Sequence, residues 1–164
     1  MQRMTSTLMT ALALCLGAAG AARADDCDTV AKAYDALSKA KSYREMVTMP
    51  NMVTLEMVAI GDTLYMKQDL KWQKVDLEPG MRAEMMKRVI PDASALKDCS
   101  RIGTEAVNGI AATIYGYTPP PMEGAPAMGP QKVWIGDDNG LPLKMTTAGA
   151  EIALSYDDVK PPIP

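Results

Sequence analysis

Histidine and phenylalanine are both absent from this sequence of 164 residues, and aromatic residues make up only 5% of it. The lack of histidine removes the most common general base and the most common metal ligand in proteins. The sequence also has no Gly-x-Ser-x-Gly nucleophile motif and no phosphate-binding loop. Its net charge of −3, without a basic stripe, gives nucleic acid no surface to bind. These absences predict a protein that is not an enzyme and needs no cofactor.

The apolar stretch from Leu8 to Ala22 is shorter than the roughly 20 residues that a membrane span needs, and Arg23 and an acidic pair follow it. The first 24 residues instead have the pattern of a secretory signal peptide. Arg3 is the basic start, an apolar run extends from Leu8 to Leu16, and small residues lead to Ala24. We therefore predict cleavage after Ala24 and a single mature domain, 25–164, that is periplasmic or secreted.

Cysteine is scarce, with three residues in the chain. Cys15 lies inside the predicted signal, and because the preceding Leu14 is not a small residue, lipidation of Cys15 is the less favoured alternative. Cys27 and Cys99 remain in the mature chain, and export brings them into a compartment where thiols pair. We expect a disulfide between them that stabilises the fold by roughly 4 kcal/mol in the chain-entropy model. Without histidine, a metal site at this pair is disfavoured.

Hydrophobic spacing predicts two helices and about nine strands. From Asp26 to about Ser42, apolar residues recur at helical spacing and place Cys27 on the apolar stripe. A second helix is expected over 81–90, between Pro79-Gly80 and Pro91. Short β-type runs separated by turn signals predict strands over 43–48, 52–60, 63–67, 71–77, 101–107, 110–118, 131–136, 141–147 and 150–156. The proline-rich segment 119–130 has no periodicity and is predicted to be a flexible loop.

Several short segments of the chain resemble sequences of the LolA-like superfamily. This superfamily includes periplasmic lipoprotein carriers and mycobacterial lipoproteins that handle glycolipids. The segments are 61–67, 71–75, 103–109, 132–135 and 139–144, which read GDTLYMK, KWQKV, GTEAVNG, KVWI and NGLPLK. The resemblance implies an α+β fold in which a curved antiparallel sheet forms a half-barrel with helices on its concave face. It also implies that the space between sheet and helices holds acyl chains. The sequence departs from the carriers in its shorter length and in the absence of a clear basic residue at the cavity.

Methionine is unusually frequent, with 14 residues. Its flexible, polarisable side chain suits a wall that adapts to varied apolar ligands, although it also fills ordinary cores. The leading hypothesis is a non-catalytic carrier of a lipid, a lipoprotein acyl chain or another hydrophobic ligand, and the alternative is an envelope protein that binds protein partners through its surface. The residues predicted to line a cavity are Tyr34, Met57, Met66, Trp72, Met85, Tyr115, Tyr117 and Trp134.

A lesser alternative concerns Met46, Met49 and Met52. Thioether sulfur is a ligand that Cu(I) prefers, so this set could bind that ion in an exported protein. Spacing of three residues suits a helix or an irregular loop better than a strand, and Pro50 interrupts the run. We therefore predict no metal site as the leading interpretation.

Overall fold

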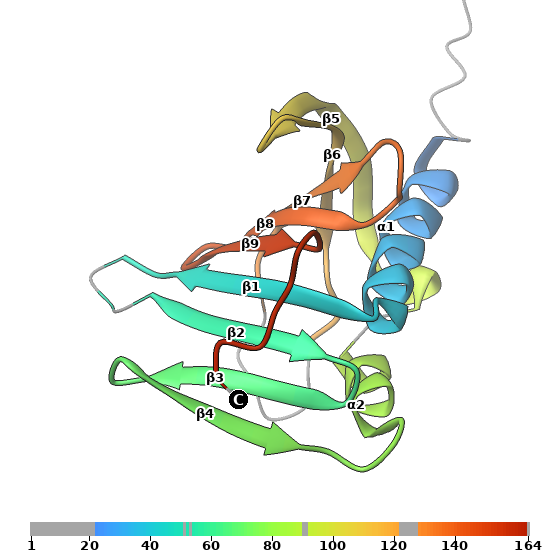
Figure 1. The fold of residues 1–164 in the computed structure, drawn as a ribbon. Helices are drawn as coiled ribbons and strands as arrows, with labels where there is room; N and C mark the ends of the chain where they lie inside the picture. Colours follow the sequence, from blue (N-terminus) through green and yellow to red (C-terminus); the bar gives the residue numbers. More distant parts are fainter. Residues whose placement is uncertain (1–21, 51, 53, 90–91, 122–127, 164) are drawn as a thin grey trace, which may run out of the picture.

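The computed structural model describes residues 22–50, 52, 54–89, 92–121 and 128–163, and Figure 1 shows its fold. The predicted signal sequence up to residue 21, with Cys15, lies outside the described residues, as does the middle of the predicted loop 119–130. Within the described part of the chain, no helix is both long enough and apolar enough to cross a membrane.

The described strands form a nine-stranded antiparallel sheet with the order β4-β3-β2-β1-β9-β8-β7-β6-β5. The strands β1 to β4 lie side by side in sequence order, and so do β5 to β9. The two series join in the middle of the sheet, where β1 pairs with β2 on one side and with β9 on the other. The strands are β1 (Ser42–Thr48), β2 (Leu55–Ile60), β3 (Thr63–Gln68), β4 (Lys71–Asp76), β5 (Lys97–Val107), β6 (Ile110–Thr118), β7 (Gln131–Gly136), β8 (Pro142–Thr146) and β9 (Glu151–Ser155).

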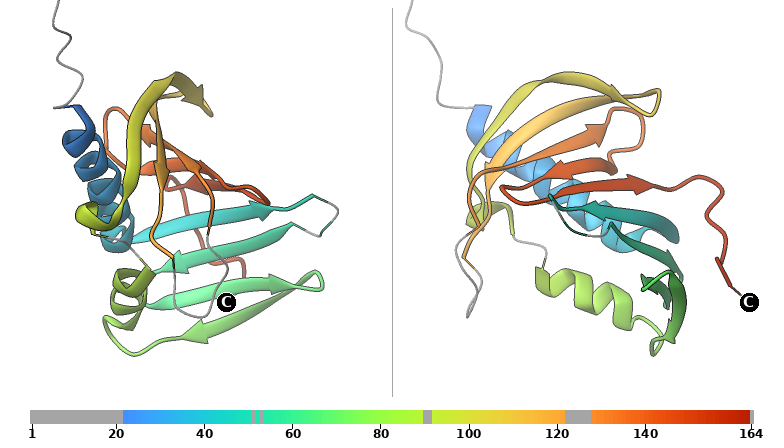
Figure 2. Two further views of the ribbon diagram at one scale, coloured as in Figure 1. Left: turned by 180° about the vertical axis from the view of Figure 1, so that it is seen from behind. Right: turned by 90° about the vertical axis from the view of Figure 1, so that its left-hand side faces the viewer.

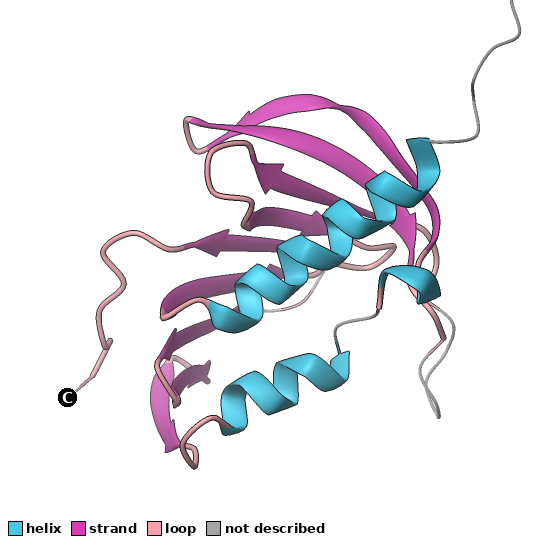
Figure 3. Cartoon of the chain, turned by 90° about the vertical axis from the view of Figure 1, so that its right-hand side faces the viewer, coloured by secondary structure: helices cyan, strands magenta, loops and turns pink. Residues whose placement is uncertain are grey.

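The sheet is strongly curved and its outer strands, β4 and β5, do not pair, so it forms a half-barrel. Two helices, α1 (Ala22–Lys39) and α2 (Met81–Val89), lie on its concave side, as Figures 2 and 3 show. The short 3-10 helix η1 (Ala93–Ala95) follows α2. The predicted α+β fold, with two helices against a curved sheet of nine strands, is confirmed.

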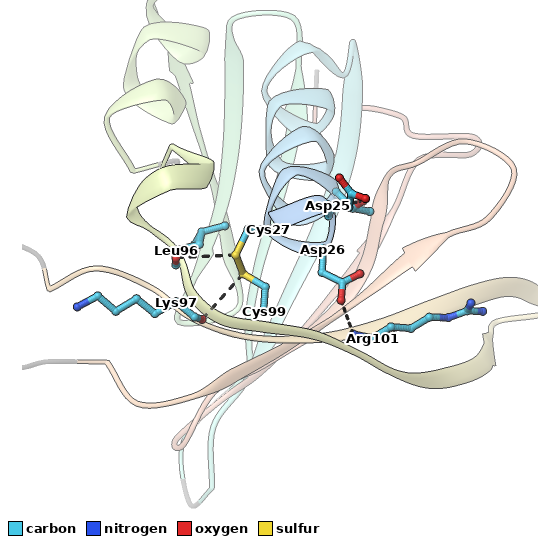
Figure 4. Close-up of a disulfide and its surroundings, with 8 residues drawn as sticks. Asp25, Asp26, Cys27, Leu96, Lys97, Cys99 and Arg101 are labelled. Atoms are coloured by element: carbon cyan, nitrogen blue, oxygen red, sulfur yellow. Dashed lines mark hydrogen bonds between the residues drawn. A yellow bond between two sulfur atoms is a disulfide. The ribbon is translucent and has the colours of Figure 1, made fainter. Parts of the chain in front are cut away.

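The helix α1 is held against the sheet by a disulfide between Cys27 and Cys99 of β5 (Figure 4). The two Cα atoms are 5.2 Å apart, a normal separation for a disulfide. Beside it, the backbone N–H of Arg101 donates to Asp26 Oδ2 at 3.1 Å. The predicted pairing is confirmed, and it links the start of the first helix to an edge strand.

Two apolar clusters join the helices to the concave face. The first contains Val30 and Ala33 of α1, packed with Tyr117 and Val133 of the sheet. The second contains Leu37 at the end of α1, packed with the concave-face residues Tyr43, Ala59 and Leu154. These side chains are almost fully buried, so the core lies mainly under α1.

Two strands begin three or more residues from their predicted starts, and the other strands begin within one residue of theirs. β2 begins at Leu55 rather than at 52, because Met52 N–H bonds back to Met49 O at 3.2 Å and widens the preceding turn. β5 begins at Lys97 rather than at 101, since Lys97 already pairs with Thr118 across an irregular register. This extension places Cys99 inside the strand.

The opposite, convex face of β1 to β3 is covered by the C-terminal segment, which runs across these strands in Figures 1 and 2. Val58 and Tyr65, which are register partners, are buried on this face. Both faces of this half of the sheet therefore carry apolar residues.

Candidate functional site

An apolar cavity lies on the concave face of β1, β2 and β3. It has a volume of about 240 Å³. The helices pack near one end of these strands, at Tyr43 and Ala59, and the cavity lies toward the other end, where the β1–β2 and β3–β4 turns extend away from the helices (Figure 1). The lining residues are Glu45, Val47, Leu55, Glu56, Met57, Met66, Lys67 and Gln68.

Cross-strand pairing assembles the wall of this cavity. Glu45 of β1 is the register partner of Met57 of β2, which in turn is opposite Met66 of β3. Val47 and Leu55 are partners in the next row. Because side chains alternate between the faces of a strand, these residues all project from the same face as Tyr43 and Ala59. The flexible thioethers of Met57 and Met66 give the wall an adaptable surface.

Glu45 is an acidic side chain in this otherwise apolar wall. It is partly buried, and burial raises its pKa above the ordinary value of 4.5 because the charged form is poorly solvated there. No lysine or arginine in the described residues forms an ion pair with it. The cavity therefore combines apolar side chains with one carboxyl group that has no cationic partner in the described chain.

Glu56, the next acid along the sheet, has the opposite arrangement. Its two carboxylate oxygens accept hydrogen bonds from Arg44 Nη1 at 3.1 Å and from Lys67 Nζ at 3.2 Å. Lys67 also lies over the ring of Trp72, 5.6 Å from its centroid. Glu56 and Lys67 border the cavity, but they alternate in sequence with Leu55, Met57 and Met66, so their side chains extend from the convex face. The carboxylate of Glu56 thus has two cationic partners within the sheet.

Under α1 the concave face is closed by packing. The hydroxyls of Tyr34 and Tyr117 share a hydrogen bond, and Tyr117 also donates to Gln131 Oε1 at 2.7 Å. Met145 Sδ lies 3.0 Å from the hydroxyl oxygen of Tyr34. Burial is the main cause that raises the pKa of both phenols, so both stay neutral at physiological pH. These residues are neighbours of the buried cluster around Val133.

Helix α2 is attached by a buried arginine. Arg82 is 8% exposed, and its Nε and Nη2 donate to Gly61 O and Ala40 O, each at 2.6 Å. Its guanidinium carbon lies 5.6 Å from the centroid of the Tyr43 ring. Asp62 completes the attachment, since its Oδ2 accepts a hydrogen bond from Gly80 N at 2.9 Å. One side chain thus joins α2 to the β2–β3 turn and to the residue after α1.

The predicted cavity residues fall into four groups. Met57 and Met66 line the cavity. Tyr34, Tyr115 and Tyr117 pack under α1, whereas Met85 lies on α2 with 49% of its surface exposed.

The two tryptophans lie away from the cavity, on the other face of the sheet. Trp72 is the partner of Lys67, and Trp134 Nε1 donates to Glu105 Oε2 at 2.6 Å while Lys144 Nζ lies 4.7 Å from its ring centroid. Strand alternation explains this placement, because Trp134 and the concave-face Val133 are consecutive residues. The structure therefore brings two of the eight predicted residues to the cavity.

Sequence reasoning missed Glu45, Val47 and the contribution of β1 to the cavity. The available signal was the alternation of Tyr43, Glu45 and Val47, which places a carboxyl between two apolar residues on one face. The cavity also lies beyond the helices, rather than in the space between sheet and helices where the resemblance implies that acyl chains are held. That space is occupied by the buried clusters.

The residues of the copper hypothesis do not share one element. Met46 lies on β1, 43% exposed and on the face opposite Glu45, and Met49 and Met52 lie in the turn that follows, where Met52 is 64% exposed. Among the described residues, no group of three or more histidine, cysteine, aspartate or glutamate side chains is arranged to hold a metal. Binding of Cu(I) stays an untested alternative.

No family defined by sequence matches the chain, and no curated protein is similar to it in sequence. Solved structures are similar in fold. The lipoprotein LppX from Mycobacterium tuberculosis aligns with a TM-score of 0.54 and 17% identity over 85% of this chain and 97% of LppX. LprF from Mycobacterium bovis aligns with a TM-score of 0.52 and 15% identity over 87% and 96% of the two chains.

A chain of the Pseudomonas aeruginosa MucA/MucB complex aligns with a TM-score of 0.50 and 13% identity over 84% of this chain and 59% of that chain. At these identities the comparisons describe the arrangement of the backbone. The comparisons agree with the short sequence segments that resemble LolA-like proteins and with the half-barrel described above. The chain therefore shares the half-barrel fold of LppX and LprF, in agreement with what the resemblance to LolA-like proteins implied for the fold.

Proposed function

We propose that this protein is a non-catalytic exported carrier that binds one alkyl or acyl chain of a hydrophobic ligand in the cavity on β1, β2 and β3. The observation that carries the proposal is an apolar cavity on the concave face of a half-barrel, lined by Val47, Leu55, Met57 and Met66. Burial of an alkyl chain there would contribute about 25 cal/mol per Å² of apolar surface before the costs of ordering.

The size of the cavity limits how much of a ligand it can hold. Pockets for whole drug-sized molecules begin at roughly 300 Å³. At about 240 Å³, the cavity suits a single chain or one part of a larger lipid, with the rest of the ligand outside. The similarity in fold to the lipoprotein LppX is consistent with a role in the cell envelope. Export itself rests on the predicted signal sequence.

The test is a pair of tryptophan substitutions at neighbouring residues of β1. Val47→Trp places a large side chain in the cavity, and Met46→Trp, the matched control, places the same side chain on the exposed opposite face. Calorimetric titration of the oxidised chain with decanol should show binding by the wild type and by Met46→Trp, and at least tenfold weaker binding by Val47→Trp. Absence of binding by the wild type, or equal binding by the two variants, would contradict the proposal.

A second candidate is an envelope protein that binds a protein partner. It is favoured by one observation, the similarity in fold to a chain of the complex between MucA and MucB. A protein of this kind would bind neither decanol nor copurifying lipid, and it would retain a specific partner from envelope extract. The same titration therefore separates the two candidates before any partner is sought.

A further inference from the structure

The cavity contains a charged group that a carrier of fatty-acid anions would not need. Glu45 projects into it from the middle of β1, between its register partners Met57 on β2 and Leu154 on β9. Val47, next on the same face of β1, continues the apolar wall. An ionised carboxyl in such surroundings is poorly solvated, and a ligand that supplies a positive charge would relieve that cost.

The chain itself provides no such charge within the described residues. Lys67 and Arg44, the basic residues nearest in the sheet, both bind Glu56 on the other face. Arg82 lies against the ring of Tyr43 and donates to two backbone carbonyls. The remaining polar groups close enough to Glu45 to be influenced by its charge are the phenols of Tyr43 and Tyr156, which are neutral at physiological pH.

The pairing of Glu56 shows that the sheet can neutralise an acid where the structure requires it. Glu56 receives two cations at 3.1 and 3.2 Å, whereas Glu45, one strand away, faces the cavity without one. A purely structural residue at position 45 would be expected to be apolar like Tyr43 and Val47, since an uncompensated carboxyl in an apolar wall destabilises the fold. The position of Glu45 is therefore better explained by a ligand than by packing.

We infer that the cavity selects amphiphiles with a cationic head, such as an ammonium group next to an alkyl chain, and that Glu45 binds that head while Met57 and Met66 contact the chain. This inference rests on the proposed carrier function and specifies its ligand class. Fatty-acid anions would bind poorly, because two like charges would then share one apolar cavity. Cationic and anionic ligands of the same chain length should therefore differ in affinity.

The test compares three ligands with the same chain, decylamine, decanol and decanoate, by calorimetric titration at pH 7.5. The wild type should bind decylamine at least tenfold more tightly than decanoate, with decanol between them. In Glu45→Gln, which keeps the shape of the side chain, decylamine and decanoate should bind within about twofold of each other. Glu151→Gln, the matched control, removes a carboxylate that pairs with Lys144 on the other face of the sheet, and it should keep the wild-type preference.

The outcomes distinguish the selection of cationic ligands by Glu45 from the carrier function itself. If decanol binds but decylamine and decanoate bind equally to the wild type, or if Glu45→Gln keeps the full preference, the selection by Glu45 is wrong and the carrier function stands. If none of the three ligands binds, the carrier function is wrong and the inference falls with it. Binding of decanol by Glu45→Gln also shows that the variant has an intact cavity.

Discussion

At the scale of single residues, Arg82 is the side chain whose loss should matter most for the position of α2. It is buried and donates to two backbone carbonyls from separate segments, Gly61 O and Ala40 O. Arg82→Met should lower the free energy of unfolding by about 1 to 3 kcal/mol, because these acceptors lose their donors. Arg101→Met, at an exposed position, should change it by less than about 0.5 kcal/mol. Urea unfolding of both variants makes the comparison, and an equal effect of the two substitutions would contradict this role.

Glu45 should also make stability depend on pH. Its pKa is higher in the folded protein than in the unfolded chain, so the folded state binds the proton more tightly. The stabilisation is fully present below pH 4.5 and is lost as the pH rises through the folded pKa. The neighbouring phenols of Tyr43 and Tyr156 do not titrate in this range, since burial raises their pKa values further.

Glu45→Gln should accordingly raise the melting temperature at pH 7.5 and change it little at pH 4. Glu56→Gln is the contrasting variant, because it removes a carboxylate that pairs with Arg44 and Lys67. It should lower stability at pH 7.5, by about 1 kcal/mol or less for such partly exposed pairs. Thermal unfolding followed by circular dichroism at the two pH values measures both effects. A lower melting temperature for Glu45→Gln at pH 7.5 would show that its carboxylate is stabilised in the folded state.

At the scale of elements, the disulfide joins α1 to β5 across 72 residues of chain. Closing a loop of this length stabilises a protein by about 4 kcal/mol in the chain-entropy model. The double variant Cys27→Ala, Cys99→Ala should therefore have a much lower midpoint of urea unfolding than the oxidised chain. The wild type treated with a reducing agent is the control and should unfold near the same midpoint as the double variant. A midpoint unchanged by both treatments would mean that packing of α1 alone holds the helix.

The β3–β4 hairpin contains a residue in an unfavourable conformation. Leu70 has φ of 66° and is 85% exposed, so a leucine occupies a left-handed position without any packing to compensate. Leu70→Gly should raise the free energy of unfolding by about 1 kcal/mol, whereas Leu70→Ser, which keeps a β-carbon, should raise it less. Denaturant unfolding tests whether Leu70→Gly is more stable than Leu70→Ser and both are more stable than the wild type. A loss of stability in Leu70→Gly would indicate that Leu70 makes a contact that stabilises the tip of the β3–β4 hairpin.

The order of helices and strands could be predicted from the sequence because local signals mark it. Turn residues such as Asn108-Gly109, where both residues have positive φ, locate a hairpin, and helical spacing places Cys27 toward the sheet. The site was predicted only in part. Of the predicted residues, Met57 and Met66 line the cavity. Which face of the sheet the helices cover, and how far along the strands they reach, depends on long-range packing of residues such as Leu37 and Arg82.

At the scale of the whole molecule, the helices cover one part of the half-barrel and leave another part for a cavity. Under α1 the concave face is filled by buried residues such as Val30 and Val133. Toward the turns that join β1 to β2 and β3 to β4, the same face has a cavity instead. This division separates a stabilising half, which carries the disulfide, from a half in which the proposed ligand would not disturb the core.

The most direct test of the account uses methionine methyl groups as reporters in the oxidised chain. With methionine labelled by ¹³C at the methyl carbon, titration with decanol should shift the NMR signals of Met57 and Met66, which line the cavity. The signals of Met46, on the opposite face of β1, and of Met85, exposed on α2, should not move. Decanol that shifts none of these signals, or that shifts Met46 and Met85 as much as Met57 and Met66, would contradict a ligand cavity on β1, β2 and β3.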